Sequence, residues 1–417
     1  MKKLALTSIL LSFGACKWTE FDDLETEAWA HSTTKPDSNA SDWGFALPPG
    51  GSVTDPSPGD RLIVLGTSQA LYTELNYTPT GGVDLAPGEV KLNSQFAIAT
   101  LDLQPILVTD PVSGEYSLVV NSGGGSVAIL SGSHQVNQRQ IFNPKSAMPD
   151  AAAYVMAPLA GGPTSQLIVA TADTVYGSPF PNPPPTQATC ALTEADGTTA
   201  VLVRAIGGVR TVDAKTIDDI VVWSTTGKLF VYPAGVFTAD ALVCPSGSAK
   251  PIAGSTVVDT GFLPAKGSQL HVLDHRFVIL AGHHELPDTM SKVMMFDMQA
   301  GAGLAPALVG SPLTREGQRS STILALDATR RFAVLGFPGD AVNGTNCGQV
   351  ALYAITANGF DATPAAQLSD AQPETNELFG RAVAAFSFNG HPILAVGADN
   401  EVFAYFRTTL YDDTRAQ

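Results

Sequence analysis

The chain has 417 residues, and its 23 Lys and Arg against 39 Asp and Glu give a formal net charge of −16. This acidic balance weighs against binding to nucleic-acid phosphates, which requires basic patches, and a hydrophobic content of 44% weighs against disorder. The 39 glycines, the 29 prolines and the low charged content of 15% favour many short strands joined by turns.

Residues 1–15 are predicted to be a secretory signal peptide. Lys2 and Lys3 form a basic start, and residues 4–13 form an apolar stretch. This stretch is too short to cross a bilayer, which takes about 20 residues, but it has the length of a signal-peptide core. The protein is therefore expected to be exported.

The end of this segment, SFGAC at residues 12–16, resembles the bacterial lipobox, in which two small residues precede the cysteine that becomes the lipid-modified N terminus. Phe13 stands where lipoproteins prefer Leu. The resemblance implies that Cys16 is lipidated, that the lipid is the only membrane anchor and, with Lys17 next to it, that the protein is attached to the outer membrane of the cell envelope. The alternative is ordinary cleavage near residue 14 or 15, which releases a soluble protein.

Residues 16–40 are predicted to form an acidic, lipid-anchored tether. Acidic residues are concentrated at 20–27, and the run that follows is rich in Ser, Thr and Pro. Such segments bury too little apolar surface to order themselves. Trp18, Trp29 and Trp43 are nevertheless three of the four tryptophans, which indicates that part of the tether lies against the folded domain.

Residues 41–417 contain a repeated pattern. Seven short, apolar, β-branched runs recur about 50 to 60 residues apart, at 61–66, 116–121, 166–171, 219–223, 276–281, 331–336 and 392–397. A second run often follows a Gly-containing turn, which is typical of a β-hairpin, and the continuous runs fit strands covered on both faces. The spacing predicts an all-β fold, a seven-bladed β-propeller of four-stranded antiparallel blades; a pair of β-sandwiches is the alternative. We expect a strand from the N-terminal region to close the ring on the last unit, near 402–410.

The last unit resembles an FG-GAP repeat, the blade unit of integrin-α-type propellers and of bacterial VCBS-repeat proteins. FG at 379–380 matches the first half of the motif, and VGA at 396–398 matches the second half without its proline. Related motifs stand at 43–47 and 335–339, so the resemblance covers residues 41–406 with clear motifs in three of seven units. It implies the same seven-bladed ring.

FG-GAP blades commonly hold calcium in a carboxylate-rich loop between their first two strands. Calcium takes about six to eight oxygen ligands, so several carboxylates must lie close together. The corresponding loops of this chain are depleted, and only weak candidates remain in the fourth unit, Asp213, Asp218 and Asp219. Aspartates without a metal commonly bond turn amides, and we expect no cofactor.

Three cysteines follow Cys16. Cys190 and Cys244 flank one repeat and form the candidate disulfide, because export brings them into an oxidising compartment. Cys347 is then expected to remain a thiol. The wide spacing of the three does not fit a zinc site.

Four of the seven histidines lie within 14 residues: His271, His275, His283 and His284. A shared metal is disfavoured, because the apolar strand between the first two and the last two places them at opposite ends.

Local catalytic motifs do not carry an assignment. The segment 66–70 is one residue away from a nucleophile elbow, but no helix is predicted after it. The glycines at 123–125 lie between two strands, and 226–228 lies inside a hairpin, so neither can cradle a phosphate at a helix N terminus. We assign no catalytic residue.

Two functions from different classes are compatible with these features. The first is a non-catalytic binding, adhesion or scaffold module for a protein or glycan at the cell envelope, expected to be a monomer that binds no nucleic acid. Its candidate binding loops lie at 175–187 and 283–292, and the side chains singled out in and beside them are Tyr176, Phe180, His283 and His284. The alternative is an exported propeller enzyme, a polysaccharide hydrolase or lyase with its residues at the central channel.

Overall fold

The fold was analysed in a computed structural model. Before residue 188 the structure describes the strands given below together with Asp173. From there it describes residues 188–209, 219–232, 237–238, 241–242, 252–253, 255–283, 290–299, 306–326, 329–341, 345–370, 375–388, 391–399 and 402–407. This part of the chain is all-β, with 59% of its residues in strands and none in a helix. None of these residues accordingly belongs to a helix that is long and apolar enough to cross a membrane.

The strands form seven sheets of four or five strands. The sheets are numbered here in the order in which their first β-hairpins occur along the chain. The first sheet contains β2 (Trp43–Ala46), β3 (Ile63–Gly66), β4 (Leu71–Thr78), β5 (Gly82–Leu85) and β6 (Val90–Lys91). The second contains β7 (Ile106–Thr109), β8 (Tyr116–Gly123), β9 (Ser126–Gly132) and β10 (Asn137–Phe142). The third contains β11 (Ala153–Pro158), β12 (Ser165–Thr171), β13 (Thr174–Pro179), β14 (Ala188–Thr193) and β20 (Ile252–Ala253). The fourth contains β15 (Val203–Val209), β16 (Asp219–Ser224), β17 (Lys228–Tyr232) and β21 (Ser255–Asp259).

The fifth sheet contains β22 (Gln269–Leu273), β23 (Phe277–His283) and β24 (Met290–Asp297), and β24 also pairs with both β25 (Ala307–Leu308) and β26 (Leu313–Glu316). The sixth contains β27 (Ser320–Ala325), β28 (Arg331–Phe337) and β29 (Gln349–Thr356), and β29 also pairs with β30 (Gly359–Phe360) and β31 (Ala366–Leu368). The seventh contains β32 (Ala382–Phe388), β33 (His391–Gly397), β34 (Val402–Arg407) and β1 (Trp29–Thr34). A separate hairpin is formed by β18 (Phe237–Thr238) and β19 (Ala241–Leu242). Every pairing is antiparallel except that of β14 with β20.

Each of the seven apolar runs predicted from the sequence forms the second strand of a different sheet, namely β3, β8, β12, β16, β23, β28 and β33. Where side chains are described, these strands are buried along their length: residues 220–224 of β16 and 278–281 of β23 are all buried. The predicted hairpins with Gly-containing turns are confirmed at β8–β9, β16–β17, β28–β29 and β33–β34. Continuous apolar strands form here because neighbouring side chains cover both of their faces.

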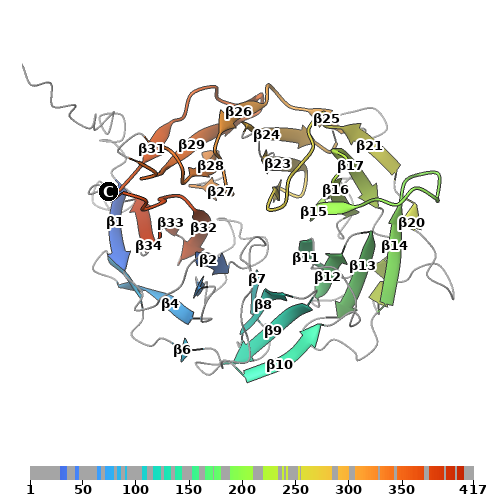
Figure 1. The fold of residues 1–417 in the computed structure, drawn as a ribbon, viewed down its shortest axis with the longest axis horizontal. Helices are drawn as coiled ribbons and strands as arrows, with labels where there is room; N and C mark the ends of the chain where they lie inside the picture. Colours follow the sequence, from blue (N-terminus) through green and yellow to red (C-terminus); the bar gives the residue numbers. More distant parts are fainter. Residues whose placement is uncertain are drawn as a thin grey trace, which may run out of the picture.

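The two ends of the described chain meet in one sheet. In Figure 1 the sheets follow one another in chain order, and the blue strand β1 lies beside the red strand β34. These strands pair antiparallel from Trp29 opposite Arg407 to Thr34 opposite Val402. The predicted pairing of an N-terminal strand with the last unit is confirmed, and β1 lies within the range 16–40 that was predicted to be a tether.

The apolar core lies between successive sheets. One buried cluster joins the fourth and fifth sheets, a second joins the fifth and sixth, and a third joins the sixth and seventh. Each contact between two such sheets is called a joint below. The joints fix how the loops and edges of neighbouring sheets lie against one another, and the candidate site is built at one of them.

Candidate functional site

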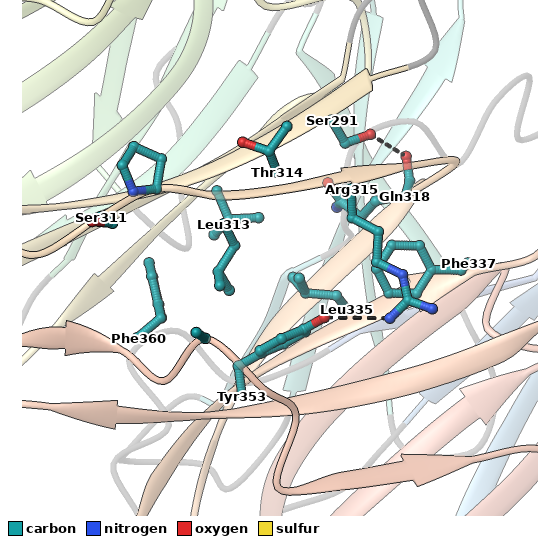
Figure 2. Close-up of a pocket in the computed structure, with 13 residues that line it drawn as sticks. Ser291, Ser311, Leu313, Thr314, Arg315, Gln318, Leu335, Phe337, Tyr353 and Phe360 are labelled. Carbon is teal, nitrogen blue, oxygen red and sulfur yellow. Dashed lines mark hydrogen bonds between the residues drawn. The ribbon is translucent and has the colours of Figure 1, made fainter.

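A pocket of about 200 Å³ opens at the joint between the fifth and sixth sheets (Figure 2). Its apolar wall consists of Leu313 from β26, Leu335 and Phe337 from β28, and Phe360 from β30. Val293, Pro312 and Ala362 also line it, together with the polar residues Ser291, Ser311, Thr314, Arg315, Gln318 and Tyr353. Figure 2 shows Leu313 extending from β26 toward the strands that carry Phe360 and Tyr353. The pocket therefore has an apolar floor and a polar edge.

The alternating pattern of β26 places two of these side chains. Leu313 and Arg315 are partly buried, whereas Thr314 and Glu316 are exposed. Successive side chains of a strand point to opposite faces, so the two alternate residues face the sixth sheet together. Pairing of β26 with β24, from Val293 opposite Leu313 onward, holds this strand at the joint.

Arg315 is fixed in place by three partners. Its guanidinium carbon lies 4.2 Å from the centre of the Phe337 ring, its Nη1 donates to the hydroxyl of Tyr353 at 3.3 Å, and its Nη2 forms an ion pair with Asp340 Oδ2 at 3.2 Å. The amide of Gln349 also donates to Asp340 Oδ2. A planar guanidinium stacked on a ring and held at two nitrogens loses little further freedom when a ligand arrives. The polar edge is thus preorganised, and its charges are balanced.

Hydrogen-bonding capacity remains at this edge. The hydroxyl oxygen of Tyr353 accepts a hydrogen bond from Arg315, which is the only partner of this hydroxyl among the described residues. The O–H of Tyr353 can therefore donate to a ligand. The Gln318 side chain is buried and donates from Nε2 to the carbonyl of Ser320 at 3.2 Å, which fixes the orientation of the amide. Its Oε1 meets no donor within the described part of the chain. Buried polar atoms normally have partners, so this one marks an incomplete network beside the pocket.

The next joint, between the sixth and seventh sheets, is filled. Phe379 is fully buried and meets Phe403 edge-to-face, with ring centres 5.1 Å apart. The carbonyl of Gly380 accepts a hydrogen bond of 2.7 Å from Ser320 Oγ, and a Cβ on Gly336 would collide with that carbonyl. Backbone from one sheet therefore lies directly against backbone from the other, which only glycine at residue 336 permits. Phe379 of the FG pair thus fills this joint, and a buried aromatic side chain that fills a joint in this way is called a plug below.

The joint between the fourth and fifth sheets is also filled by a phenylalanine. Phe262 is 5% exposed and stacks on Trp223, with ring centres 6.2 Å apart. A Cβ on Gly282 would collide with the rings of both Phe262 and Trp223, and a Cβ on Gly227 would collide with the carbonyl of Phe262. An aromatic plug with close glycines therefore occurs at two of these three joints.

Among the described residues, the fifth–sixth joint has no equivalent of Phe379. The amide of Arg319 donates to the carbonyl of Gly336 at 3.0 Å, and the amide of Arg381 donates to the carbonyl of Gly397 at 3.2 Å, so the two segments approach equivalent strands in the same way. The segment before Arg381 contains Phe379, whereas residues 316–318 before Arg319 are Glu, Gly and Gln.

The side chain that would face the plug is missing as well. In the seventh sheet Phe403 lies opposite Val396, and at the matching register of the sixth sheet Ala351 lies opposite Leu335. A Cβ on Gly317 would meet nothing within 4 Å. The pocket thus opens at the joint where the sequence supplies neither of the two phenylalanines.

A serine–histidine contact at the inner edge of this joint was tested as a catalytic pair. His271 Nε2 lies 2.7 Å from Ser321 Oγ, joining β22 to β27. The backbone amide of Ser321 donates to Gln269 Oε1 at 2.7 Å, so that atom is an acceptor, and Ser321 Oγ donates to it at 2.6 Å. The serine proton is therefore already engaged, and His271 Nε2–H must donate to Ser321. This is the reverse of nucleophile activation, and the contact is a clamp between two sheets.

Burial lowers the pKa of His271 from 6.5 to about 4, so the ring is neutral at physiological pH. A neutral imidazole suits the single donated hydrogen bond to Ser321.

None of the described residues that were predicted to be functional lines the pocket, although His283 lies opposite Ser291, which does. Tyr176 is in β13, Cys190 in β14, Asp219 is the first residue of β16 and His283 is the last of β23. The remaining predictions fall outside the described residues: Cys16, Phe180, Asp213, Asp218, Cys244 and His284. The lipidation and disulfide predictions therefore stay predictions. His275 and His283 lie at opposite ends of β23, as expected, since His275 precedes the strand and His283 is its last residue.

Within the described residues there is no group of three or more His, Cys, Asp or Glu placed to hold a metal. Asp274 lies in the turn between β22 and β23 of the fifth sheet and forms an ion pair with Arg331 of the sixth sheet. Cys347 is buried and carries a thiol, as expected. Burial and, to a smaller extent, the nearby Glu377 carboxylate raise the pKa of that thiol. A raised pKa lowers the thiolate fraction and makes the group unreactive.

The pocket residues were not predicted from the sequence. Arg315, Asp340 and Tyr353 come from three different strands or turns and form no local motif. The usable signal was the departure from the FG pattern at 316–318, because the equivalent segment of the following unit contains Phe379. No protein-family model matches the chain, and no curated protein matches it.

Proposed function

We propose that the protein is an exported, lipid-anchored β-propeller that binds a protein or glycan partner without catalysing a reaction. The observation that carries the binding role is the pocket at the fifth–sixth joint, where a fixed Arg315–Asp340 pair borders an apolar floor. Concave sites with an apolar lining and a few oriented polar groups are the usual form of a ligand site. Sheets locked together by close backbone contacts supply a rigid frame for it.

The seven-bladed ring is supported by the seven sheets that follow one another in chain order and by the pairing of β1 with β34. The FG pair at Phe379 and Gly380 supports an FG-GAP-like blade. Cysteines introduced at Ser32 and Ala404, which lie opposite each other, test the closure. We expect an intramolecular disulfide that raises the thermal midpoint, whereas the pair Ser32→Cys with Ala366→Cys, in another sheet, forms none. Absence of the first disulfide contradicts the closed ring.

The lipid anchor rests on the lipobox-like end of the signal peptide at Cys16. In a bacterial host that processes lipoproteins, Cys16→Ser is expected to abolish palmitate labelling and to release the protein from membranes. Cys347→Ser is the matched control and should change neither. Unchanged labelling of Cys16→Ser contradicts the lipoprotein assignment.

The binding role is tested at the mouth of the pocket. Ala362 lines the pocket and is exposed, so Ala362→Trp blocks the mouth without disturbing the core. Thr363, its neighbour, is exposed and does not line the pocket, so Thr363→Trp adds the same ring elsewhere. Purified full chains are compared for binding to envelope proteins and to a glycan panel.

We expect one class of partner that binds the unchanged protein and Thr363→Trp but not Ala362→Trp. Equal binding by all three chains, or no partner in either class, contradicts the proposal. Turnover of a polysaccharide that survives repurification favours the exported enzyme instead.

A further inference from the structure

We infer that the pocket at the fifth–sixth joint receives one aromatic side chain, a phenylalanine or tyrosine, from a protein partner. This inference rests on the proposed binding function and names the chemistry of its partner. The partner's ring takes the place of the plug that this joint lacks.

The neighbouring joints show which group fits such a space. Phe262 and Phe379 fill theirs from within the chain and are at most 5% exposed. The segment 316–318 and the facing Ala351 leave the fifth–sixth joint without either ring. The pocket at this joint therefore has room for a ring supplied from outside.

The size of the pocket agrees with a single side chain. Sites that enclose drug-sized ligands have volumes of about 300–1,000 Å³. The volume of about 200 Å³ here holds one ring and not a larger ligand. Binding hot spots in protein interfaces are commonly aromatic side chains inserted into pockets of this kind.

The lining favours an aromatic ring over a sugar or a charged group. Leu313, Phe337 and Phe360 offer dispersion and edge-to-face contacts but no hydrogen bonds. The hydroxyls of a buried sugar ring would each need a partner, whereas the polar groups of this lining are confined to one edge. A single charge is disfavoured because Arg315 is already balanced by Asp340.

The polar edge can orient the ring. The Tyr353 O–H is available to donate, and Ser311, an exposed residue of the lining, lies where the pocket reaches solvent. A tyrosine hydroxyl or the partner's backbone can bond to these groups. The partner chain thus runs across the exposed residues at the mouth, Ser311, Thr314 and Ala362, with its ring pointing inward.

The test uses small probes on the full chain. N-acetyl-tyrosine amide and N-acetyl-phenylalanine amide carry the proposed ring, N-acetyl-alanine amide carries the same backbone without it, and a neutral methyl glycoside represents a sugar. Saturation-transfer NMR and competition measure their binding to the unchanged protein, Ala362→Trp and Thr363→Trp. Thermal unfolding confirms that both variants are folded.

We expect both aromatic amides to bind the unchanged protein and Thr363→Trp, with at least about tenfold weaker binding to Ala362→Trp. The alanine amide and the glycoside should not bind. If the glycoside competes at the pocket, or if the aromatic amides fail to bind, the inference is overturned. In that event a partner that still discriminates Ala362→Trp from Thr363→Trp leaves the proposed binding function standing.

Discussion

The sixth–seventh joint and the fifth–sixth joint are two versions of one contact. In both, the segment before the first strand of the later sheet continues that sheet's own ladder, because an amide donates to the carbonyl of a glycine in the second strand of the same sheet, at Gly397 in one case and Gly336 in the other. The first joint is closed by Phe379 packed on Phe403, and the second contains the pocket, which Leu335 lines. The pairing of the first two strands thus does not depend on the aromatic pair, and the fifth–sixth joint keeps a buried apolar cluster of its own beside the pocket.

The difference extends to the inner edges of the two joints. At the closed joint Thr322 Oγ1 accepts from the amide of Ala385 at 3.3 Å, a contact that does not titrate. At the open joint the clamp runs from Gln269 and His271 to Ser321. Of these two inner contacts, the one through His271 contains a group whose protonation responds to pH.

The largest effect is expected from emptying the closed joint. Phe379→Ala removes a fully buried ring and its contact with Phe403, and we expect a loss of about 3–5 kcal/mol in the free energy of unfolding. Urea denaturation of the full chain measures it. Leu308→Ala, at a side chain that is 48% exposed, is the control and should change the value by less than about 0.5 kcal/mol. A loss below about 1 kcal/mol for Phe379→Ala would show that the FG ring is not the plug.

The second effect concerns the pH dependence of the open joint. Because the pKa of His271 is lowered to about 4 in the folded protein, the unfolded chain takes up this proton first as the pH falls below 6.5. The contribution of His271 to stability is complete above pH 6.5 and is lost between pH 6.5 and 4, by about 3 kcal/mol.

This loss is measured by urea denaturation across that range. His271→Gln keeps a donor for Ser321 but has no proton to take up, so the difference between the two chains removes the effect of the many carboxylates. Parallel stability curves for the two chains would contradict a lowered pKa at His271.

Much of the fold could be predicted from the sequence because each sheet has one strand covered on both faces. Such a strand is a continuous apolar run, as at residues 278–281 and 333–335, and the run identifies its sheet without knowledge of any partner. The hairpins followed from glycine turns such as Gly227, whose φ is 81°. The outer strands were harder to predict, because β25 and β26 are short, only partly buried and both pair with β24.

The site could not be predicted in the same way. Arg315, Asp340 and Tyr353 meet only because two sheets are placed against each other, and their spacing in the chain contains no record of that placement. The exposed loops drew attention because of unusual composition, whereas the pocket arises from ordinary residues and from two missing rings. A departure from a repeat is informative only once the role of the repeated residue is known, and the structure shows that role at Phe379.

A smaller effect is expected where backbones touch. A Cβ on Gly336 would collide with the Gly380 carbonyl and with Ser320 Oγ, so we expect Gly336→Ala to cost about 1–3 kcal/mol in the free energy of unfolding. Gly339 has nothing within 4 Å of a Cβ and serves as the matched control, with Gly339→Ala expected to be neutral. Thermal and urea unfolding both report the difference. Equal stability of the two variants would mean that the closed joint is looser than its backbone contact indicates.

The smallest effect is expected at the open joint itself. Tyr353→Phe removes the hydroxyl that accepts a hydrogen bond from Arg315. The Arg315 guanidinium keeps its contacts with Asp340 and Phe337, and water reaches it because the Arg315 side chain is 30% exposed. We expect a loss of about 0.5–1 kcal/mol in the free energy of unfolding, and a double-mutant cycle with Arg315→Met isolates this contact. A loss above about 2 kcal/mol would mean that the polar edge is needed to hold the joint together. If Tyr353→Phe loses little free energy of unfolding but binds the aromatic amides more weakly, the hydroxyl is assigned to ligand binding, because its removal then affects the ligand and not the fold.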